Sequence, residues 1–346
     1  MTPSATLRTG RWRLAAALLL ALALAFVLAS CGSDDDGEAT TATAADKASA
    51  AFPVTIEHKY GSTTIEAEPK RIVTVGMTDQ DTFLALGIKP VGVDDWFGER
   101  PYGNWPWTKA RWGSFKPTVV GQYDEYKFEK IAALRPDLIV GLYSGMTKGS
   151  YAKLSKIAPT IAQPKGHADY SAPWQLMAEI SGRAVGREAE ARKLVADAEA
   201  RFAKVRDEHA DFKGKSITIT EFYEGEFSTF GADDPRHQFF TQLGFVVDPE
   251  IRKLYPGGKT GMLSSEKLDI LDGDRLVVLS SPETEKQVAA HKLFHRVPVV
   301  RDGRTVYLPY ERPKPEGAAL VFNTVLSIPY ALDAIVPKLA DPQAQR

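Results

Sequence analysis

The distribution of hydrophobic residues after position 54 alternates between two patterns. Runs rich in β-branched residues, which favour strands, alternate with segments whose apolar residues recur at helical spacing. In the first half, strands are expected at residues 54–65, 71–76, 90–93, 137–142 and 160–162, and helices at 79–86, 128–134 and 148–157. This alternation is typical of a parallel sheet covered by helices on both faces. Ligands of such sheets bind beyond the carboxyl ends of the strands.

One long segment, residues 186–211, interrupts the alternation. It contains no Gly or Pro after its first residue, and Leu194, Ala198, Phe202 and Val205 recur at helical spacing. A helix of about 22 residues would be roughly 33 Å long. We therefore expect a rigid connecting helix at 186–212.

The alternation resumes beyond this helix. Strands are expected at 216–222, 275–279, 297–300 and 305–308, and helices at 234–243, 283–291 and 317–339. The sequence therefore predicts an α/β fold in which two Rossmann-like lobes, at 54–185 and 213–346, are joined by a single long helix.

A short repeat relates the two lobes. EKIAALRPDLIV begins at Glu129 and EKLDILDGDRLVV begins at Glu266. In each copy an Asp follows the Glu by eight residues, at Asp137 and Asp274. Each copy predicts a short helix, a tight turn and a buried strand. The repeat indicates that the lobes are similar and that Glu129 and Glu266 occupy equivalent positions.

The first 30 residues have the pattern of a signal peptide. Arg8, Arg11 and Arg13 precede an uninterrupted apolar run at 14–29, whose 16 residues fall short of the roughly 20 that span a bilayer. The sequence LASC ending at Cys31 resembles the bacterial lipobox, in which the Cys is lipidated and becomes the new N-terminus. We therefore expect residues 1–30 to be removed. The mature chain would be a lipoprotein held by Cys31 at the outer face of the cytoplasmic membrane.

Composition separates a leash from a globular part. Residues 31–53 are rich in Ala, Thr, Asp and Glu, so we expect a flexible acidic leash there. From residue 52 onward, 39 acidic side chains balance 39 basic ones, which excludes a basic surface for nucleic acid. Cys31 is the only cysteine, so the globular part has no disulfide and depends on its hydrophobic core.

Four stretches resemble the iron-siderophore ABC transporter substrate-binding proteins of Gram-positive bacteria. They are PKRIVTVGMTDQDTFLALGIKPVGVDDW (69–96), FEKIAALRPDLIVGLYSG (128–145), YAKLSKIAPTIA (151–162) and ALVFNTVLSIPYALDAIVPKLA (319–340). The resemblance implies a class III solute-binding protein that is not an enzyme, with a shallow cleft between two lobes. It also implies a ferric siderophore as the ligand and an ABC importer permease as the partner.

The resemblance further implies that Glu129 and Glu266, one on each lobe, pair with arginines of the permease. The alternative is that the two carboxylates only stabilise the N-termini of their helices, where each contributes roughly 0.3–1 kcal/mol.

A ferric siderophore surrounds its iron with its own oxygens. Its receptor needs aromatic walls and Arg, Lys or Tyr donors, but no metal ligands. A loop rich in Pro and Gly follows the strand at 90–93, and its aromatic residues are expected to form a wall, or else to pack on the lobe's own surface. These residues are Trp96, Tyr102, Trp105 and Trp107. Tyr143 and Met146 follow the strand at 137–142 and are expected to face the cleft.

The second lobe is expected to supply the opposite wall. Tyr223 ends the strand at 216–222, while Tyr310 and Arg312 follow the last strand. Arg236 opens a helix, where a cation is unfavourable, and this indicates a contact with an anion. We therefore expect all four side chains to contact the ligand.

The sequence gives little support to an enzymatic or metal-binding function. The motifs of serine hydrolases, phosphate-binding loops, dinucleotide-binding folds and zinc proteases are absent. His291 and His295 form a close pair but have no third ligand nearby, so packing or a surface role is expected rather than a metal site. No cofactor is expected. The open alternatives are a haem or corrinoid receptor, in which haem would need an axial His, Tyr or Met, and a lipid-anchored enzyme.

Overall fold

The structure is a computed structural model that describes residues 52–96, 98, 101–256, 259–311 and 314–345. The predicted signal peptide, Cys31, most of the predicted leash and Arg312 lie outside the described residues. Among the helices that are described, none is both long enough and apolar enough to cross a membrane.

The first lobe contains a six-stranded sheet with the order β6-β5-β4-β3-β7-β8. Its strands are β3 (Ile72–Thr74), β4 (Gly92–Asp95), β5 (Thr118–Gln122), β6 (Glu125–Tyr126), β7 (Leu138–Val140) and β8 (Thr160–Ile161). All neighbours are parallel except β5 and β6, which form an antiparallel pair. A separate hairpin of β1 (Val54–His58) and β2 (Gly61–Ile65) precedes it. The sequence did not predict β5 and β6.

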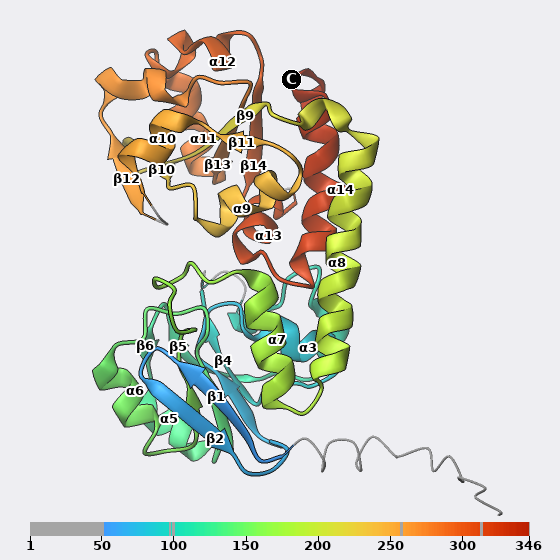
Figure 1. Ribbon diagram of the computed structural model, residues 1–346. Coiled ribbons are helices and arrows are strands. Elements are labelled where there is room, and N and C mark those ends of the chain that lie inside the picture. Colours follow the sequence, from blue (N-terminus) through green and yellow to red (C-terminus); the bar gives the residue numbers. More distant parts are fainter. Residues whose placement is uncertain (1–51, 97, 99–100, 257–258, 312–313, 346) are drawn as a thin grey trace, which may run out of the picture. The chain divides into compact units, whose positions relative to one another are not determined.

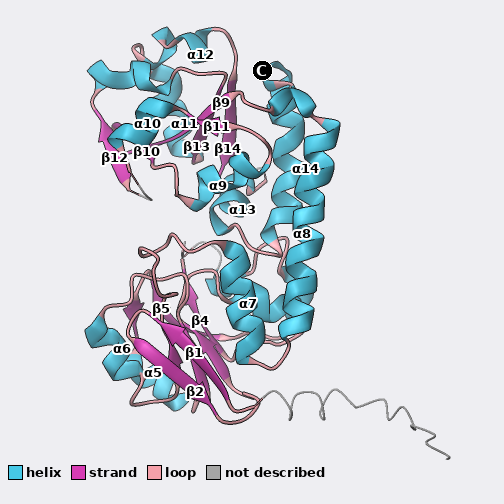
Figure 2. Ribbon diagram, in the orientation of Figure 1, coloured by secondary structure: helices cyan, strands magenta, loops and turns pink. Residues whose placement is uncertain are grey.

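Helices cover both faces of this sheet (Figure 2). On β3, Ile72 packs into a core shared with α3 (Gln80–Ala85) and α7 (Trp174–Ala184). The next residue, Val73, points the other way and packs with α5 (Phe128–Ala133) and α6 (Lys148–Leu154). Successive strand residues therefore serve opposite cores, which explains why the strand pattern is continuously hydrophobic rather than alternating.

The predicted connecting helix is present as α8 (Glu188–Glu208), 21 residues long. It contacts α7 and α14 (Ser327–Ala340), and Figure 1 shows α14 running beside it. Ala191, Val195, Ala198 and Phe202 form its buried stripe, and the predicted stripe residues Leu194 and Val205 are partly buried beside it. Burial of this narrow stripe fixes the helix against both neighbours, as its helical spacing predicts.

The second sheet has the order β12-β10-β9-β13-β14, with β11 also paired to β9. Its strands are β9 (Ser216–Tyr223), β10 (Glu226–Phe230), β11 (Val246–Val247), β12 (Thr260–Leu263), β13 (Arg275–Ser280) and β14 (Thr305–Pro309). Strands β9, β13 and β14 are parallel, whereas β10 and β12 continue the sheet in antiparallel order. Glu224 and Gly225 both have positive φ, as a two-residue hairpin turn between β9 and β10 requires.

Helices also cover the faces of the second sheet. They are α9 (Pro235–Gln242), α10 (Pro249–Leu254), a 3-10 helix (Ser265–Leu271), α11 (Pro282–Ala290), α12 (Pro298–Arg301), α13 (Glu316–Phe322) and α14. On β13, Val277 and Leu279 pack into the core that contains α9 and α14, while Leu276 and Val278 pack with α11 and α12.

Two predictions for the second lobe were wrong. The expected strand at 297–300 is instead the N-cap residue and first turn of α12 (Pro298–Arg301), because Pro298 suits the first turn of a helix and has no N–H to donate in a strand. The expected single helix at 317–339 is divided into α13 and α14. Asn323 takes a left-handed conformation with φ of 46°, which ends α13.

The short repeat has a structural explanation. The Asp137 carboxylate accepts hydrogen bonds from the backbone N–H groups of Lys70 and Arg71, just before β3. In the second lobe, Asp274 accepts from the backbone N–H of Ser216, the first residue of β9. Each repeated Asp therefore fixes the start of the first parallel strand of its sheet.

Candidate functional site

A cavity of about 660 Å³ opens where strands of the two sheets end. Its aromatic lining consists of Trp96, Tyr123, Phe222, Tyr223 and Tyr310. Tyr123 and Tyr223 are each 60 % exposed, so their rings are available to a ligand rather than being packed in a core. The cavity combines apolar walls with phenol groups that can donate hydrogen bonds.

Strand ends position most of these residues. Trp96 directly follows β4, Tyr223 is the last residue of β9, and Tyr310 directly follows β14. These are carboxyl ends of parallel strands, where a ligand of such a sheet is expected. Tyr123 comes from the turn between β5 and β6, in a left-handed conformation with φ of 48°. The cavity therefore brings together four of the predicted ligand residues: Trp96, Tyr223, Arg236 and Tyr310.

Arg236 is held in place by its neighbours. The side chain of Asp234, the N-cap of α9, accepts hydrogen bonds from the Arg236 backbone N–H at 2.9 Å and from Arg236 Nη1 at 2.7 Å. The guanidinium carbon lies 3.9 Å from the centre of the Phe230 ring. From the sequence, a cation at this helix start is a sign that Arg236 contacts an anionic ligand. That expectation needs a correction, because the carboxylate of Asp234 is the anion that Arg236 contacts.

Glu221 and Tyr310 form a second polar pair in the cavity wall. The Tyr310 side chain hydrogen-bonds that of Glu221. Burial raises the pKa of Tyr310 well above its usual value, so its hydroxyl stays protonated and is a donor. Burial also raises the pKa of Glu221, although nearby Arg236 opposes this shift.

The structure places Trp105 and Trp107 in packing rather than in the cavity wall. Trp105 is 1 % exposed, and its ring lies parallel to that of Trp107 with centroids 5.3 Å apart. Both indoles also pack edge-on against Phe322, at 5.6 and 5.4 Å. We call Trp105, Trp107 and Phe322 the indole stack. This packing favours the alternative to a ligand wall, in which these aromatic residues pack against the protein itself.

Three further predicted ligand residues also lie outside the cavity lining. Tyr102 packs edge-on against Trp112. Tyr143 is 4 % exposed and lies behind Trp96, with ring centroids 5.7 Å apart. Met146 is buried in the first-lobe core, where its methyl group fills the space that a Cβ of Gly141 would need.

A buried carboxylate ties the indole stack to the rest of the protein. Asp81 Oδ2 accepts hydrogen bonds from Trp107 Nε1 at 3.0 Å and from Thr324 Oγ1 at 2.6 Å. Thr324 belongs to the segment between α13 and α14, so Asp81 joins α3 to the second half of the chain. Burial raises the pKa of Asp81 to about 7, and the nearby Asp79 carboxylate adds to this effect.

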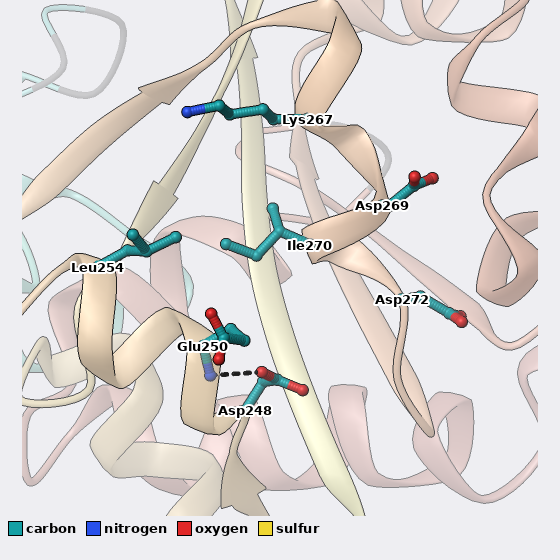
Figure 3. A pocket seen from close by; sticks show the side chains of 7 residues that line it. All are labelled: Asp248, Glu250, Leu254, Lys267, Asp269, Ile270 and Asp272. Atoms are coloured by element: carbon teal, nitrogen blue, oxygen red, sulfur yellow. Dashed lines mark hydrogen bonds between the residues drawn. The ribbon is translucent and has the colours of Figure 1, made fainter.

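The two predicted docking glutamates are exposed. Glu129 lies in the first turn of α5 and Glu266 in the first turn of the 3-10 helix at Ser265–Leu271. Beside Glu266 there is a hollow of about 460 Å³ between this 3-10 helix and α10 (Figure 3). Its lining includes the acidic residues Asp248, Glu250, Asp269 and Asp272 but no aromatic residue.

The His pair has a packing role. The His291 ring lies edge-on to Phe227, and its Nδ1 accepts a hydrogen bond from the backbone of Phe294. His295 Nε2 is 2.9 Å from the carbonyl oxygen of Ala289. Within the described parts of the chain, no group of three or more His, Cys, Asp or Glu side chains could hold a metal ion.

Several residues that line the cavity were not predicted from the sequence. Tyr123 lies on a hairpin, and Met262 on an edge strand, that were not predicted. Glu311 follows Tyr310 directly, and as a carboxylate it is not one of the donors that a chelate's oxygens require. Glu311 could have been predicted by the same rule as Tyr310, because both residues follow the end of a strand.

This fold and cavity define the class of substrate-binding proteins. The chain belongs to the periplasmic binding protein family, whose model matches residues 72–311. Members of this family bind substrates and are not enzymes, which agrees with the sequence-based prediction.

Individual relatives support the same assignment. The chain is 27 % identical over 301 residues to the probable siderophore-binding lipoprotein YfiY of Bacillus subtilis, covering 83 % of this chain and 87 % of that protein. A periplasmic solute-binding protein from Mycobacterium smegmatis has 32 % identity and a TM-score of 0.72, covering 83 % and 97 %. The ferrichrome complex of PiaA from Streptococcus pneumoniae has 26 % identity and a TM-score of 0.71, covering 84 % and 98 %. The predicted class III fold is confirmed.

Proposed function

We propose that this chain is an extracytoplasmic lipoprotein that captures a ferric siderophore and delivers it to an ABC importer. The observation that carries the proposal is the cavity, in which exposed aromatic rings stand beside Arg236 and Tyr310 as donors. A siderophore presents an apolar body and chelating oxygens, which suit such a wall. Relatives named as siderophore-binding or crystallised with ferrichrome support the same ligand class.

The cavity is a better candidate than the hollow beside Glu266. Both are large enough for a small ligand, but the hollow has four carboxylates and a single cation, Lys267. It has no ring on which a chelate could lie. Lys267 is the one side chain in its lining that carries a strong donor for chelating oxygens.

Calorimetric titration tests the ligand class. The full chain, purified in detergent, is titrated with ferric hydroxamate, catecholate and citrate chelates, and separately with haem and cobalamin. We expect saturable binding of at least one ferric siderophore. Binding of haem with a shifted Soret band, or of cobalamin alone, would reject the siderophore and favour the alternative receptors.

We propose that Glu129 and Glu266 meet basic residues of the permease, as the family resemblance implies. Both are exposed and lobe-equivalent, which two-point docking requires. Charged pairs of this kind steer association and fix its register. The double variant Glu129→Ala/Glu266→Ala should abolish uptake of radiolabelled chelate in cells while leaving chelate affinity unchanged.

A matched control separates docking from helix stabilisation. Glu283 is an exposed carboxylate in the first turn of α11, so Glu283→Ala loses the same helix-end interaction without a docking role. Normal uptake by the double variant, with a small loss of thermal stability like that of the control, would contradict docking.

The anchor is proposed from the lipobox resemblance at Cys31. Cys31→Ala should release the protein from the membrane fraction, and chelate affinity should stay the same because the cavity residues lie far along the chain. A variant that remains in the membrane fraction would reject lipidation at this residue.

A further inference from the structure

Acidic side chains outnumber basic ones in the described lining of the cavity. Among the described residues, the cavity lining contains one cation, Arg236, and two carboxylates, Glu221 and Glu311. A third carboxylate, Asp234, pairs with Arg236 directly behind the wall. The described wall therefore contains an excess of negative charge.

Arg236 does not offset this excess. Its Nη1 lies 2.7 Å from Asp234 Oδ2, and its side chain is only 15 % exposed, so the ion pair is shielded from solvent. A paired guanidinium can still donate a hydrogen bond to a chelate oxygen, but it adds little net positive potential. Asp234 thus cancels the charge of Arg236, while its donor geometry is kept.

The net charge of the described wall is negative whether or not Glu221 is protonated. Burial raises the pKa of this carboxyl group, and Tyr310 hydrogen-bonds it. If Glu221 is ionised, the lining has two carboxylates that form no ion pair within the described part of the chain. If it is neutral, Glu311 remains as one such carboxylate.

We infer that the cavity selects electroneutral or cationic ferric chelates, of the trihydroxamate kind, over anionic carboxylate or catecholate chelates. The inference rests on the proposed function and names the substrate class of the same cavity. Relatives do not decide the matter, because they include an Fe(3+)-citrate-binding protein as well as a protein crystallised with the electroneutral chelate ferrichrome.

The aromatic lining favours the same class. Tyr223, Tyr123 and Trp96 line the cavity, and the faces of aromatic rings attract cations. A cationic chelate would gain from both the rings and the carboxylates. An anionic chelate would face carboxylate repulsion, with the cation of Arg236 already paired.

The test compares matched chelates by calorimetry on the full chain in detergent. Ferrioxamine B is a cationic trihydroxamate, and acetylation of its free amine removes the charge without changing the iron centre. Ferrichrome is electroneutral, and ferric dicitrate and ferric enterobactin are anionic. A unit charge about 10 Å away changes binding on the order of tenfold in partly shielded surroundings. We expect ferrioxamine B to bind at least that much more tightly than either anionic chelate, and more tightly than its acetylated form.

Charge variants locate the effect. Glu221→Gln combined with Glu311→Gln should reduce the preference for ferrioxamine B over its acetylated form several-fold. Glu199→Gln combined with Glu208→Gln, on exposed positions of α8, makes the same change in net charge and should leave the preference intact. Raising the salt concentration should shrink the preference, which a purely steric selection would not do.

The outcomes separate this inference from the proposed function. Tighter binding of an anionic chelate than of ferrioxamine B would overturn the charge selection while leaving siderophore binding in place. Loss of that anionic binding in Arg312→Gln would identify the cation responsible, and would equally overturn the inference. Failure of every ferric chelate to bind would overturn both. Equal affinities for acetylated ferrioxamine B and the two anionic chelates would also overturn the charge selection.

Discussion

Two aromatic groups in this protein have similar composition but opposite surroundings. The indole stack of Trp105, Trp107 and Phe322 is packed on itself, and Trp105 is almost fully buried. The cavity wall presents Tyr123 and Tyr223 to solvent. Aromatic residues close together in sequence therefore do not by themselves indicate a ligand wall, since the partner that buries them can come from elsewhere in the chain.

Trp96 connects the two groups. It lines the cavity, and its ring also lies 5.5 Å from that of Phe322 in the stack. The stack supports the first-lobe wall from behind. Changes to the stack should therefore act on stability, and changes to exposed wall residues should act on affinity.

The largest expected effect is the loss of stability in Trp105→Ala. Removing a buried indole leaves a cavity, and such substitutions lower the free energy of unfolding by about 3–5 kcal/mol. Urea denaturation measures the change, with Tyr223→Ala as the control because that residue is exposed and should change stability by about 0.5 kcal/mol or less. Unchanged stability together with weaker chelate binding would show that Trp105 contacts the ligand instead of packing in the protein.

The next effect is the pH dependence that Asp81 gives to stability. Its folded-state pKa is about 7, above the ordinary value of 3.8, so the folded state binds the proton more tightly. Its contribution is fully present below about pH 4 and is lost as the pH rises toward 7, at up to about 1.4 kcal/mol per pH unit. Asp81→Asn removes this titration and can still accept from Trp107 and Thr324.

Thermal and urea unfolding of wild type and Asp81→Asn should therefore diverge between pH 4 and 8, with the variant gaining relative stability at higher pH. Asp79 and Asp94, whose pKa values burial raises to about 6 and about 8, titrate in the same direction in both proteins. Parallel stability curves would show that Asp81 is ionised normally in the fold.

A smaller effect is expected on affinity from Tyr223→Ala. An exposed ring that gains its contacts only with the ligand should contribute about 1–3 kcal/mol to chelate binding. Calorimetry with the tightest-binding chelate measures the loss, and Tyr223→Phe should retain most of the affinity if the ring face is the contact. Equal affinities for Tyr223→Ala and wild type would remove Tyr223 from the wall.

The smallest effect is expected from Trp107→Phe. An aromatic ring remains against Trp105 and Phe322, but the hydrogen bond from Nε1 to Asp81 is lost. The free energy of unfolding should fall by about 0.5–1.5 kcal/mol, because Asp81 keeps the hydrogen bond from Thr324. Affinity for the chelate should not change, which distinguishes the stack from the wall.

The sequence predicted the elements whose patterns are local. The strand at β3 and the helix at α8 follow from β-branched runs and from a clear helical stripe, and both are present. The division at Asn323 was missed because it depends on one left-handed residue, which a continuous apolar pattern hides. The strands β5 (TVVGQ) and β12 (TGML) were missed because a Gly interrupts the apolar pattern in each.

The candidate site was predictable only in part. Tyr223 and Tyr310 were identified because strand ends place them at the cavity, a rule that needs only strand direction. The burial of Trp105 depends on Phe322, from near the other end of the chain, and the pairing of Arg236 depends on rotamers that no pattern records. Local patterns therefore predicted backbone positions better than side-chain surroundings.

The indole stack also affects the optical behaviour of the protein. Of the tryptophans that the structure describes, Trp96 alone lines the cavity, while Trp105, Trp112 and Trp174 are each at most 2 % exposed. Their emission should be blue-shifted, because buried indoles are shielded from water. A coloured iron chelate would quench this emission by energy transfer without touching the rings. The quenched fraction that disappears in Trp96→Phe would then be the share of the one described indole that lines the cavity.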